Sequence, residues 1–274
     1  MHNLHPSTVE SFGDEWSRFD QARMSQEEAE KVFKEYFAVF PWAELTLDAE
    51  GFDMGCGSGR WARMAAPRVG RLHCVDPSEA IRVAEKMLCN FDNVVFHKNS
   101  LDSTGLQPAS QDFGYSLGVL HHVPDTAAAI RSCAELLKPG APLLLYLYYA
   151  FDNRPLWFRA VWRLTDLARH LIYPLPPTLK HFVTDVIAAL VYWPLARLSR
   201  LIARMGYSVS SIPLSFYRNH SFYTMRTDAR DRFGTPLEQR FTRRQIEKMM
   251  LNAGLTEIRF SESAPYWCAV GVKA

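Results

Sequence analysis

The most informative segment of the chain is Phe52-Asp53-Met54-Gly55-Cys56-Gly57-Ser58-Gly59. Its three alternating glycines allow a sharp turn and a close approach between backbone and ligand, because no Cβ stands in the way. Asp53 precedes the first glycine by two positions, and Asp76 ends the next apolar run. In open α/β sheets, such a turn followed by an acid after the second strand holds a nucleoside, whose ribose hydroxyls donate to the carboxylate. The pattern predicts an enzyme that uses a nucleoside cofactor.

The composition is that of a globular protein with a sizeable core. The chain has 274 residues, 48% hydrophobic and 22% charged, with a net charge of +2. This balance gives no preference for nucleic acid or for acidic partners. Residues 151–210 hold eight Lys/Arg and three Asp/Glu, a net charge of +5, which leaves −3 for the remainder. The middle segment is therefore distinct from the rest of the chain.

Cysteine usage and the apolar runs indicate a cytoplasmic protein. The five cysteines are odd in number, scattered and free of C-x-x-C spacing, so we expect neither a metal site nor a disulfide framework. Residues 1–15 are polar and acidic, unlike a secretory signal. The longest apolar run, Val186 to Ala196, is too short to span a bilayer and contains a proline.

Strand and helix patterns alternate along much of the chain, which predicts a doubly wound, mostly parallel α/β sheet of seven strands. We expect strands just before Gly55 and over residues 72–75, 94–97, 113–117 and 142–149, with a C-terminal edge hairpin over 255–260 and 266–272. We expect helices over residues 25–40, 58–66, 78–88, 126–137 and 242–252. Ser25 and Glu28 form a candidate capping box. About ninety residues after the fifth strand lack this rhythm and are mostly helical.

At this point the chain resembles the class I S-adenosylmethionine-dependent methyltransferases, specifically those acting on small molecules. The likeness covers residues 45–150 and, more loosely, 236–274. The glycine segment is similar to the family's first motif, and Val75-Asp76-Pro77-Ser78 to its ribose-binding strand end. Further similar pieces are Asn99-Ser100-Leu101-Asp102, the run from Asp112 to Val123, and Leu136-Leu137-Lys138-Pro139-Gly140. One departure is the first strand, where residues 47–52 are polar and interrupted by a glycine.

The resemblance implies a Rossmann-like methyltransferase fold that binds S-adenosylmethionine, with S-adenosylhomocysteine as product. Asp53 would hold the glycine turn and the amino-acid end of the cofactor. Asp76 would bind the ribose diol and Asp102 the adenine, although Asn99 or Ser100 could take the role of Asp102. The implied cofactor-binding residues are Asp53, Gly55, Cys56, Gly57, Gly59, Asp76, Pro77, Ser100, Leu101, Asp102, Leu117 and Gly118.

A nicotinamide cofactor is the alternative for the glycine turn. Sites for that cofactor carry the motif G-x-G-x-x-G and a longer segment between the glycines and the acidic residue that binds the ribose. Here a single residue separates Gly57 from Gly59, and position 60 is not glycine. The spacing favours the sulfonium cofactor.

His121 and His122 are candidate catalytic residues, because a neutral imidazole can accept a substrate proton as the methyl group moves. The alternative is that one of them only packs or bonds to backbone. A sulfonium is already activated, so positioning and exclusion of water are the default source of catalysis.

The chain is expected to comprise an N-terminal helical cap (1–44), the cofactor-binding core (45–150), a helical insertion or lid on the acceptor side (151–235), and a C-terminal helix with edge strands (236–274). In similar enzymes an N-terminal segment such as that of Phe12, Trp16 and Phe19 folds across the site; simple packing is the alternative. Candidate acceptor-site residues are Tyr149, Tyr217, His220 and Tyr223.

Tryptophan and leucine alternate with arginine in the insertion. Such basic amphipathic helices either bury their apolar face as a lid or contact a membrane surface, here through residues 155–205. We expect a methyltransferase for a small, apolar acceptor, methylated on oxygen, nitrogen or carbon. The alternatives are a peripheral membrane enzyme with a lipid- or quinone-like acceptor and a non-catalytic cofactor-binding module. We find no concentrated stripe of Lys and Arg outside the apolar insertion, so nucleic acid is not an expected partner.

Overall fold

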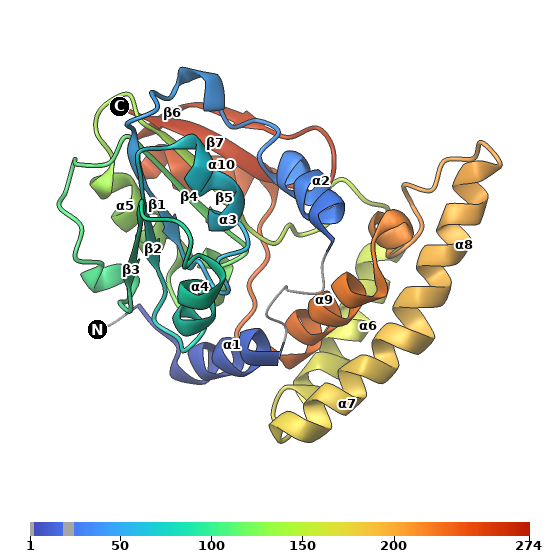
Figure 1. Ribbon diagram of the computed structural model, residues 1–274. Helices are drawn as coiled ribbons and strands as arrows, with labels where there is room; N and C mark the ends of the chain where they lie inside the picture. The colour runs from blue at the N-terminus through green and yellow to red at the C-terminus, as the bar shows by residue number, and fades with distance from the viewer. Residues whose placement is uncertain (1–2, 19–24) are drawn as a thin grey trace. The chain divides into compact units, whose positions relative to one another are not determined.

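The computed structural model describes residues 3–18 and 25–274 and divides the chain into two compact units (Figure 1). Unit 1 comprises residues 1–21, 29–150 and 237–274, and unit 2 comprises residues 22–28 and 151–236. Phe19, the third aromatic residue of the N-terminal pattern, lies outside the described residues.

Unit 1 is built on the expected mostly parallel, seven-stranded sheet. Its strands are β1 (Glu50–Met54), β2 (Arg71–Val75), β3 (Val94–His97), β4 (Phe113–Leu117), β5 (Pro142–Tyr146), β6 (Leu255–Phe260) and β7 (Cys268–Lys273). They lie in the order β3-β2-β1-β4-β5-β7-β6, and only β7 runs antiparallel to both of its neighbours. The order reverses between β1 and β4. In open α/β sheets, ligands bind beyond the carboxyl ends of the strands at such a switch point.

Helices cover both faces of this sheet. The helices of unit 1 are α1 (Pro6–Arg18), α3 (Ala62–Ala65), α4 (Ile81–Met87), α5 (Thr126–Leu136), α10 (Arg243–Asn252) and most of α2 (Gln26–Tyr36). One apolar cluster joins α2, α3 and α4 to one face, and a second joins α5 and α10 to the other. The two clusters form on opposite faces because successive side chains along a strand point to opposite sides of the sheet.

The unusual first strand is explained by its pairing with β4. Gly51 lies opposite Phe113, and Phe52 lies opposite Gly114. A Cβ on Gly51 would meet the Phe113 ring at 2.3 Å, and one on Gly114 would meet the Phe52 ring at 2.2 Å. Each glycine therefore makes room for the aromatic ring of the neighbouring strand, and both rings are fully buried.

Several predicted boundaries were wrong by a few residues. The helix expected from Ser58 begins at Ala62, because the glycine turn continues through positive φ angles at Gly57 and Gly59. Strand β5 ends at Tyr146, not at residue 149. The capping box is incomplete: Ser25 Oγ accepts from the Glu28 amide as predicted, but Glu28 Oε1 accepts from Ser221 and Thr224.

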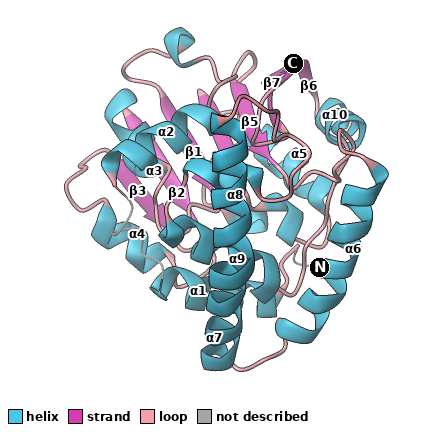
Figure 2. Ribbon diagram, turned by 90° about the vertical axis from the view of Figure 1, so that its right-hand side faces the viewer, coloured by secondary structure: helices cyan, strands magenta, loops and turns pink. Residues whose placement is uncertain are grey.

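Unit 2 holds the helical insertion expected after β5 (Figure 2). Its helices are α6 (Leu156–Ile172), α7 (Pro177–Ile187), α8 (Trp193–Arg204) and α9 (Phe222–Gly234). A π-helical turn, η5 (Ala188–Tyr192), joins α7 and α8 into one continuous helix. This helix and α9 share a small apolar core.

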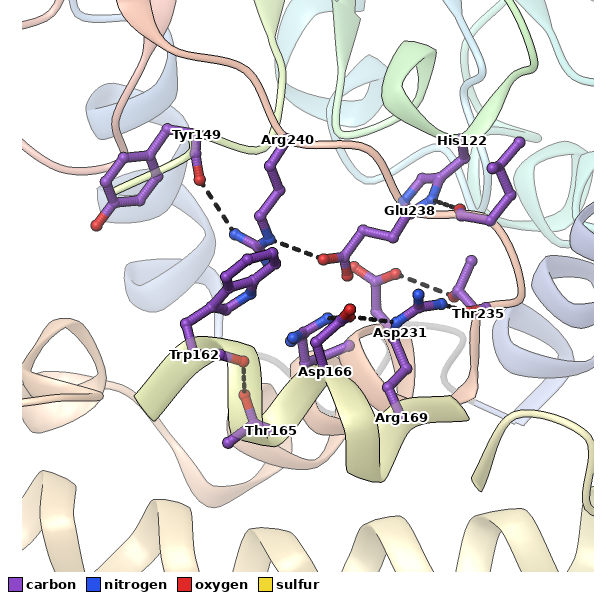
Figure 3. Close-up of polar contacts among 12 residues, drawn as sticks. His122, Tyr149, Trp162, Thr165, Asp166, Arg169, Asp231, Thr235, Glu238 and Arg240 are labelled. Atoms are coloured by element: carbon purple, nitrogen blue, oxygen red, sulfur yellow. Dashed lines mark hydrogen bonds and ion pairs between the residues drawn. The ribbon is translucent and has the colours of Figure 1, made fainter. Parts of the chain in front are cut away.

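Partly buried polar contacts tie the helices of unit 2 together. Arg226 on α9 donates to both carboxylate oxygens of Asp185 on α7, at 2.8 and 2.7 Å. Asp166 on α6 accepts from Arg169 at 2.9 Å, and Arg169 also donates to the carbonyl oxygen of Thr235 at 2.9 Å (Figure 3). Charged hydrogen bonds of this kind are stronger than neutral ones, so they fix how the helices pack.

The substitution Gly114→Ala tests the packing of β1 against β4. The new methyl group would lie within 2.2 Å of the buried Phe52 ring, so we expect the free energy of unfolding to fall by about 1–3 kcal/mol. Denaturant unfolding followed by circular dichroism measures the change. The matched control is Gly13→Ala, whose nearest contact would be 3.7 Å away, and which should cause no loss. Equal stability of the two variants would contradict the packing argument.

Candidate functional site

A glycine turn follows β1 at the switch point of the sheet. The amides of Gly55 and Cys56 both donate to the carbonyl oxygen of Val75, at 2.7 and 3.2 Å. Gly55 has a φ of +78°, and a Cβ there would meet Val119 at 2.4 Å. Only glycine meets both demands, so the turn is fixed by backbone conformation as well as by close packing.

Asp76 connects this turn to the end of β2. Its Oδ2 accepts from the Gly57 amide at 2.9 Å, while its Oδ1 accepts from the amide and the hydroxyl of Ser78 at 2.8 and 2.6 Å. The side chain is buried, and burial raises the pKa of its carboxyl although these bonds oppose the rise. A carboxylate offers about four acceptor positions, so one remains for a ligand hydroxyl. Asp76 thus lies at the turn, as the sequence predicts.

Asp53, near the end of β1, is a fully buried carboxyl. Neither of its oxygens has a hydrogen-bond partner within the described residues. Burial raises the pKa of Asp53 to about 8; the Tyr115 hydroxyl on β4 opposes the rise, and the negative charge of Asp76 adds to it. A buried acid without a partner is costly to the fold and suits a cationic ligand group.

The loop after β3 carries the residues expected at the adenine. Ser100, Leu101 and Asp102 lie in and just before a 3₁₀ turn, η3 (Leu101–Ser103). Asp102 Oδ2 accepts from the backbone amide of Asn3 at 2.6 Å. The Asn3 side chain in turn exchanges hydrogen bonds with the backbone of Asp125. The N-terminal segment therefore already engages Asp102.

Helix α1 also reaches the glycine turn. A Cβ on Gly57 would lie 3.1 Å from the Trp16 indole nitrogen. The Phe12 ring packs edge-on against His122, with centroids 4.9 Å apart. These contacts place two of the three N-terminal aromatic residues against predicted site residues.

His121 and His122 form a 3₁₀ turn with Leu120, η4, just beyond β4. His122 Nδ1 donates to the carbonyl oxygen of Leu237 at 2.6 Å, which leaves the lone pair of a neutral ring on Nε2 (Figure 3). His121 is fully buried and stacks on Tyr148, with centroids 3.9 Å apart. Burial, together with the charges of His122 and Arg240, holds the pKa of His121 well below its usual range, so this ring is neutral near pH 7.

Sequence reasoning missed a cation beside this histidine pair. Arg240 donates to Glu238 at 2.7 Å and to the carbonyl oxygen of Tyr149 at 3.3 Å (Figure 3). Its guanidinium lies 4.9 Å from the Tyr148 ring centre. Burial lowers the pKa of Arg240, but its neighbours, chiefly the Glu238 carboxylate, together have the larger effect, so the pKa of Arg240 is raised. No motif surrounds Arg240; the neighbouring Phe241 pairs with Tyr149, just beyond β5, and this pairing brings Arg240 here.

Other predicted residues fall in two places. Leu117 ends β4 and Gly118 follows it with a φ of +81°, where a Cβ would meet only the Tyr146 ring, at 4.0 Å. Tyr149 lies in unit 1, with its ring 5.7 Å from that of Tyr266. The three remaining acceptor candidates, Tyr217, His220 and Tyr223, belong to unit 2. Within the described part of the chain, no group of three His, Cys, Asp or Glu residues is arranged to hold a metal ion.

Comparison with known families agrees with this geometry. Residues 52–145 match a family model described as a methyltransferase domain. A ubiquinone biosynthesis O-methyltransferase of Xanthomonas euvesicatoria pv. vesicatoria is 32% identical over 149 residues, covering 52% of this chain and 61% of the relative. The enzyme of that name from Nitrosospira multiformis is 31% identical over 105 residues, covering 37% and 42%. The chain thus spans about 40 to 60% of the length of these curated relatives.

Solved structures share the architecture. The CurJ carbon methyltransferase gives a TM-score of 0.54 at 14% identity, covering 99% of this chain and 61% of that chain. A chain from the complex of the Haloferax volcanii Trm112 methyltransferase activator with a methyltransferase gives 0.52 at 14% identity, covering 95% and 96%. At these identities the likeness shows the fold alone.

The raised pKa of Asp53 predicts a pH-dependent penalty on stability. Folding keeps this carboxyl protonated up to about pH 8, whereas the unfolded chain ionises it near the ordinary value of 3.8. The unfolded state therefore binds fewer protons, and stability falls as pH rises between about 4 and 8, by up to about 1.4 kcal/mol per pH unit. Asp53→Asn should remove this slope and raise the free energy of unfolding near pH 7.

Chemical denaturation at about pH 5, 6, 7 and 8 measures this effect. Steps of about one pH unit resolve a slope near 1.4 kcal/mol per pH unit. The control is Asp92→Asn, because Asp92 is exposed and its removal relieves no burial. A wild-type pH profile that Asp53→Asn leaves unchanged would show that the buried carboxyl is already compensated.

Proposed function

We propose that this chain, whose residues 52–145 match a methyltransferase domain, is a class I S-adenosylmethionine-dependent methyltransferase that methylates a small, apolar acceptor. One observation carries the proposal: two buried carboxyls flank a glycine turn at the switch point of the sheet. Asp76 is held at the turn by the Gly57 amide, and Asp53 is buried without a described partner. The first suits a ribose hydroxyl, and the second suits an ammonium group.

The residues present fit the cofactor. Asp53 would hold its ammonium group, Asp76 with Pro77 its ribose, and Ser100, Leu101 and Asp102 its adenine. Gly55, Cys56, Gly57 and Gly59 would give the backbone surface, with Leu117 and Gly118 near the methionine arm. When bound, S-adenosylmethionine supplies a methyl group on a positively charged sulfur, which is activated toward nucleophiles.

We further propose that the acceptor presents a hydroxyl on an apolar, phenol-like ring. The matched relatives carry the name ubiquinone biosynthesis O-methyltransferase, and the residues around His121 are aromatic. His122 would take the hydroxyl proton on Nε2, because its Nδ1–H is engaged by the Leu237 carbonyl. The Arg240 charge would favour the oxyanion, since nearby positive charge stabilises a developing anion.

A second candidate is a peripheral membrane enzyme with a lipid- or quinone-like acceptor. The exposed apolar helices of unit 2 favour it. Tyr217, His220 and Tyr223 remain proposed acceptor contacts, and the proposed location is the cytoplasm, with membrane association. A non-catalytic module is disfavoured by the buried, neutral His121 beside Arg240, because such a polar cluster destabilises the fold without helping it bind a cofactor.

Binding of S-adenosylhomocysteine tests the cofactor assignment. Asp76→Asn removes the negative charge at the acceptor position that remains for a ribose hydroxyl, so we expect the dissociation constant to rise about 100-fold by isothermal titration. Asp92→Asn, on the exposed surface, should leave it within about twofold. Asp53→Asn should also weaken binding although it stabilises the fold, which separates lost contact from unfolding. Unchanged affinity in Asp76→Asn would remove the assignment.

The substitution His122→Gln tests the proposed base. Glutamine can still donate to the Leu237 carbonyl but cannot take a proton, so we expect kcat with a phenolic acceptor to fall by about 10² to 10⁴. Affinity for S-adenosylhomocysteine should stay within about threefold. The exposed His170 gives the control His170→Gln. An unchanged kcat would assign catalysis to positioning alone.

A further inference from the structure

Large apolar side chains that reach solvent gather in one part of the chain. Nineteen such residues occur in the described part of the molecule, and sixteen of them lie between residues 156 and 207. The other three are Leu47, Val95 and Leu251, which are far apart along unit 1. Soluble surfaces rarely collect apolar groups in this way, so the patch marks a binding surface.

The continuous helix Pro177–Arg204 has two contrasting faces along its first half. The side chains of Lys180, Thr184 and Ala188 recur every four residues and are buried. Phe182 and Val186 follow two of them by two positions, about 200° around the helix, and are 66% and 38% exposed. The helix therefore packs within unit 2 through a partly polar face and presents an apolar face to solvent.

Helix α6 repeats this arrangement. Leu164, Leu167 and Leu171 are 67%, 66% and 76% exposed and share one face. Exposed Arg159 and Arg163 adjoin that face on one side. Each helix thus combines an exposed apolar face with basic residues beside it, the pattern of helices that lie in a lipid interface.

The charge of the patch favours a lipid surface over a second copy of the chain as its binding partner. The only acidic residues between positions 156 and 207 are Asp166 and Asp185, and both are paired with arginines of unit 2. The patch is therefore cationic without an exposed acid. A symmetric dimer through it would bring like charges together, whereas anionic headgroups would neutralise them.

Length and polarity favour lying on the surface over crossing it. Helix Pro177–Arg204, with 28 residues, is long and apolar enough by composition to cross a membrane. Its uncharged run between Asp185 and Arg197 is only eleven residues, about 16 Å, against a hydrocarbon core of about 30 Å. Trp157 and Trp193 are both roughly half exposed, and such amphipathic rings favour the interface.

We propose that unit 2 docks on an anionic lipid surface, with the apolar faces of α6 and of Pro177–Arg204 at the acyl boundary and Arg159, Arg163, Arg200 and Arg204 at the headgroups. The docking rests on the proposed function and deepens it by giving the surface from which an apolar acceptor is taken. Docking itself needs neither cofactor nor acceptor. Its failure would therefore leave methyl transfer untouched.

Vesicle flotation of the full chain, without cofactor, tests the docking. The protein should float with vesicles containing phosphatidylglycerol, bind pure phosphatidylcholine more weakly, and detach as salt rises. The pair Leu164→Gln and Leu190→Gln should lower partitioning at least about tenfold, and Arg159→Gln with Arg163→Gln about fivefold per charge. The matched controls Leu47→Gln with Leu251→Gln, and Arg63→Gln with Arg131→Gln, should leave it unchanged.

Three results would overturn the proposal. The first is no flotation of the native chain, with no shift in tryptophan emission on adding anionic vesicles. The second is retention on vesicles after an alkaline carbonate wash, which indicates a spanning helix. The third is a stable dimer in light scattering that Leu190→Gln dissociates, which assigns the patch to a second copy. Circular dichroism confirms that each variant is folded.

Discussion

The architecture of unit 1 depends on the hydrogen bonds that hold the glycine turn against the end of β2. The Val75 carbonyl accepts from the Gly55 amide, and the Asp76 carboxylate accepts from the Gly57 amide. These bonds join the turn after β1 to the end of the neighbouring parallel strand β2. They hold Asp76 against the turn that follows Asp53, and the turn lies at the switch point because β4 pairs on the other side of β1. The site is thus a consequence of strand order.

The buried polar groups of this site lower the folding stability of unit 1, which contains it. Asp53 and His121 are fully buried, and neither has a hydrogen-bond partner among the described residues. A buried polar group without a partner destabilises a fold by a few kcal/mol. The apolar clusters on the two faces of the sheet offset this cost, including the interlocked Phe52 and Phe113 rings. A ligand site that lowers stability within a well-packed scaffold that restores it is the expected balance between function and stability.

Sequence predicts best where the signal is local. The glycine turn and the acid after β2 are read from adjacent residues, and β3, β4 and β6 have the predicted bounds. The polar first strand could not be interpreted alone, because Gly51 makes sense only opposite Phe113. Arg240 had no signal either. It reaches the histidine pair because Phe241 pairs with residues 148–150, about ninety positions earlier.

The pairing of Phe241 with residues 148–150 also closes the insertion at its base. The Phe241 amide donates to the Tyr148 carbonyl, and the Phe241 carbonyl accepts from Ala150. Residues 151–236 leave and rejoin unit 1 beside this bridge, so the two ends of the insertion are fastened together. The same few residues carry Arg240 and the Tyr148 ring that contacts His121. A change that displaces the base of the insertion would therefore also displace the cation and the ring that surround the buried histidine.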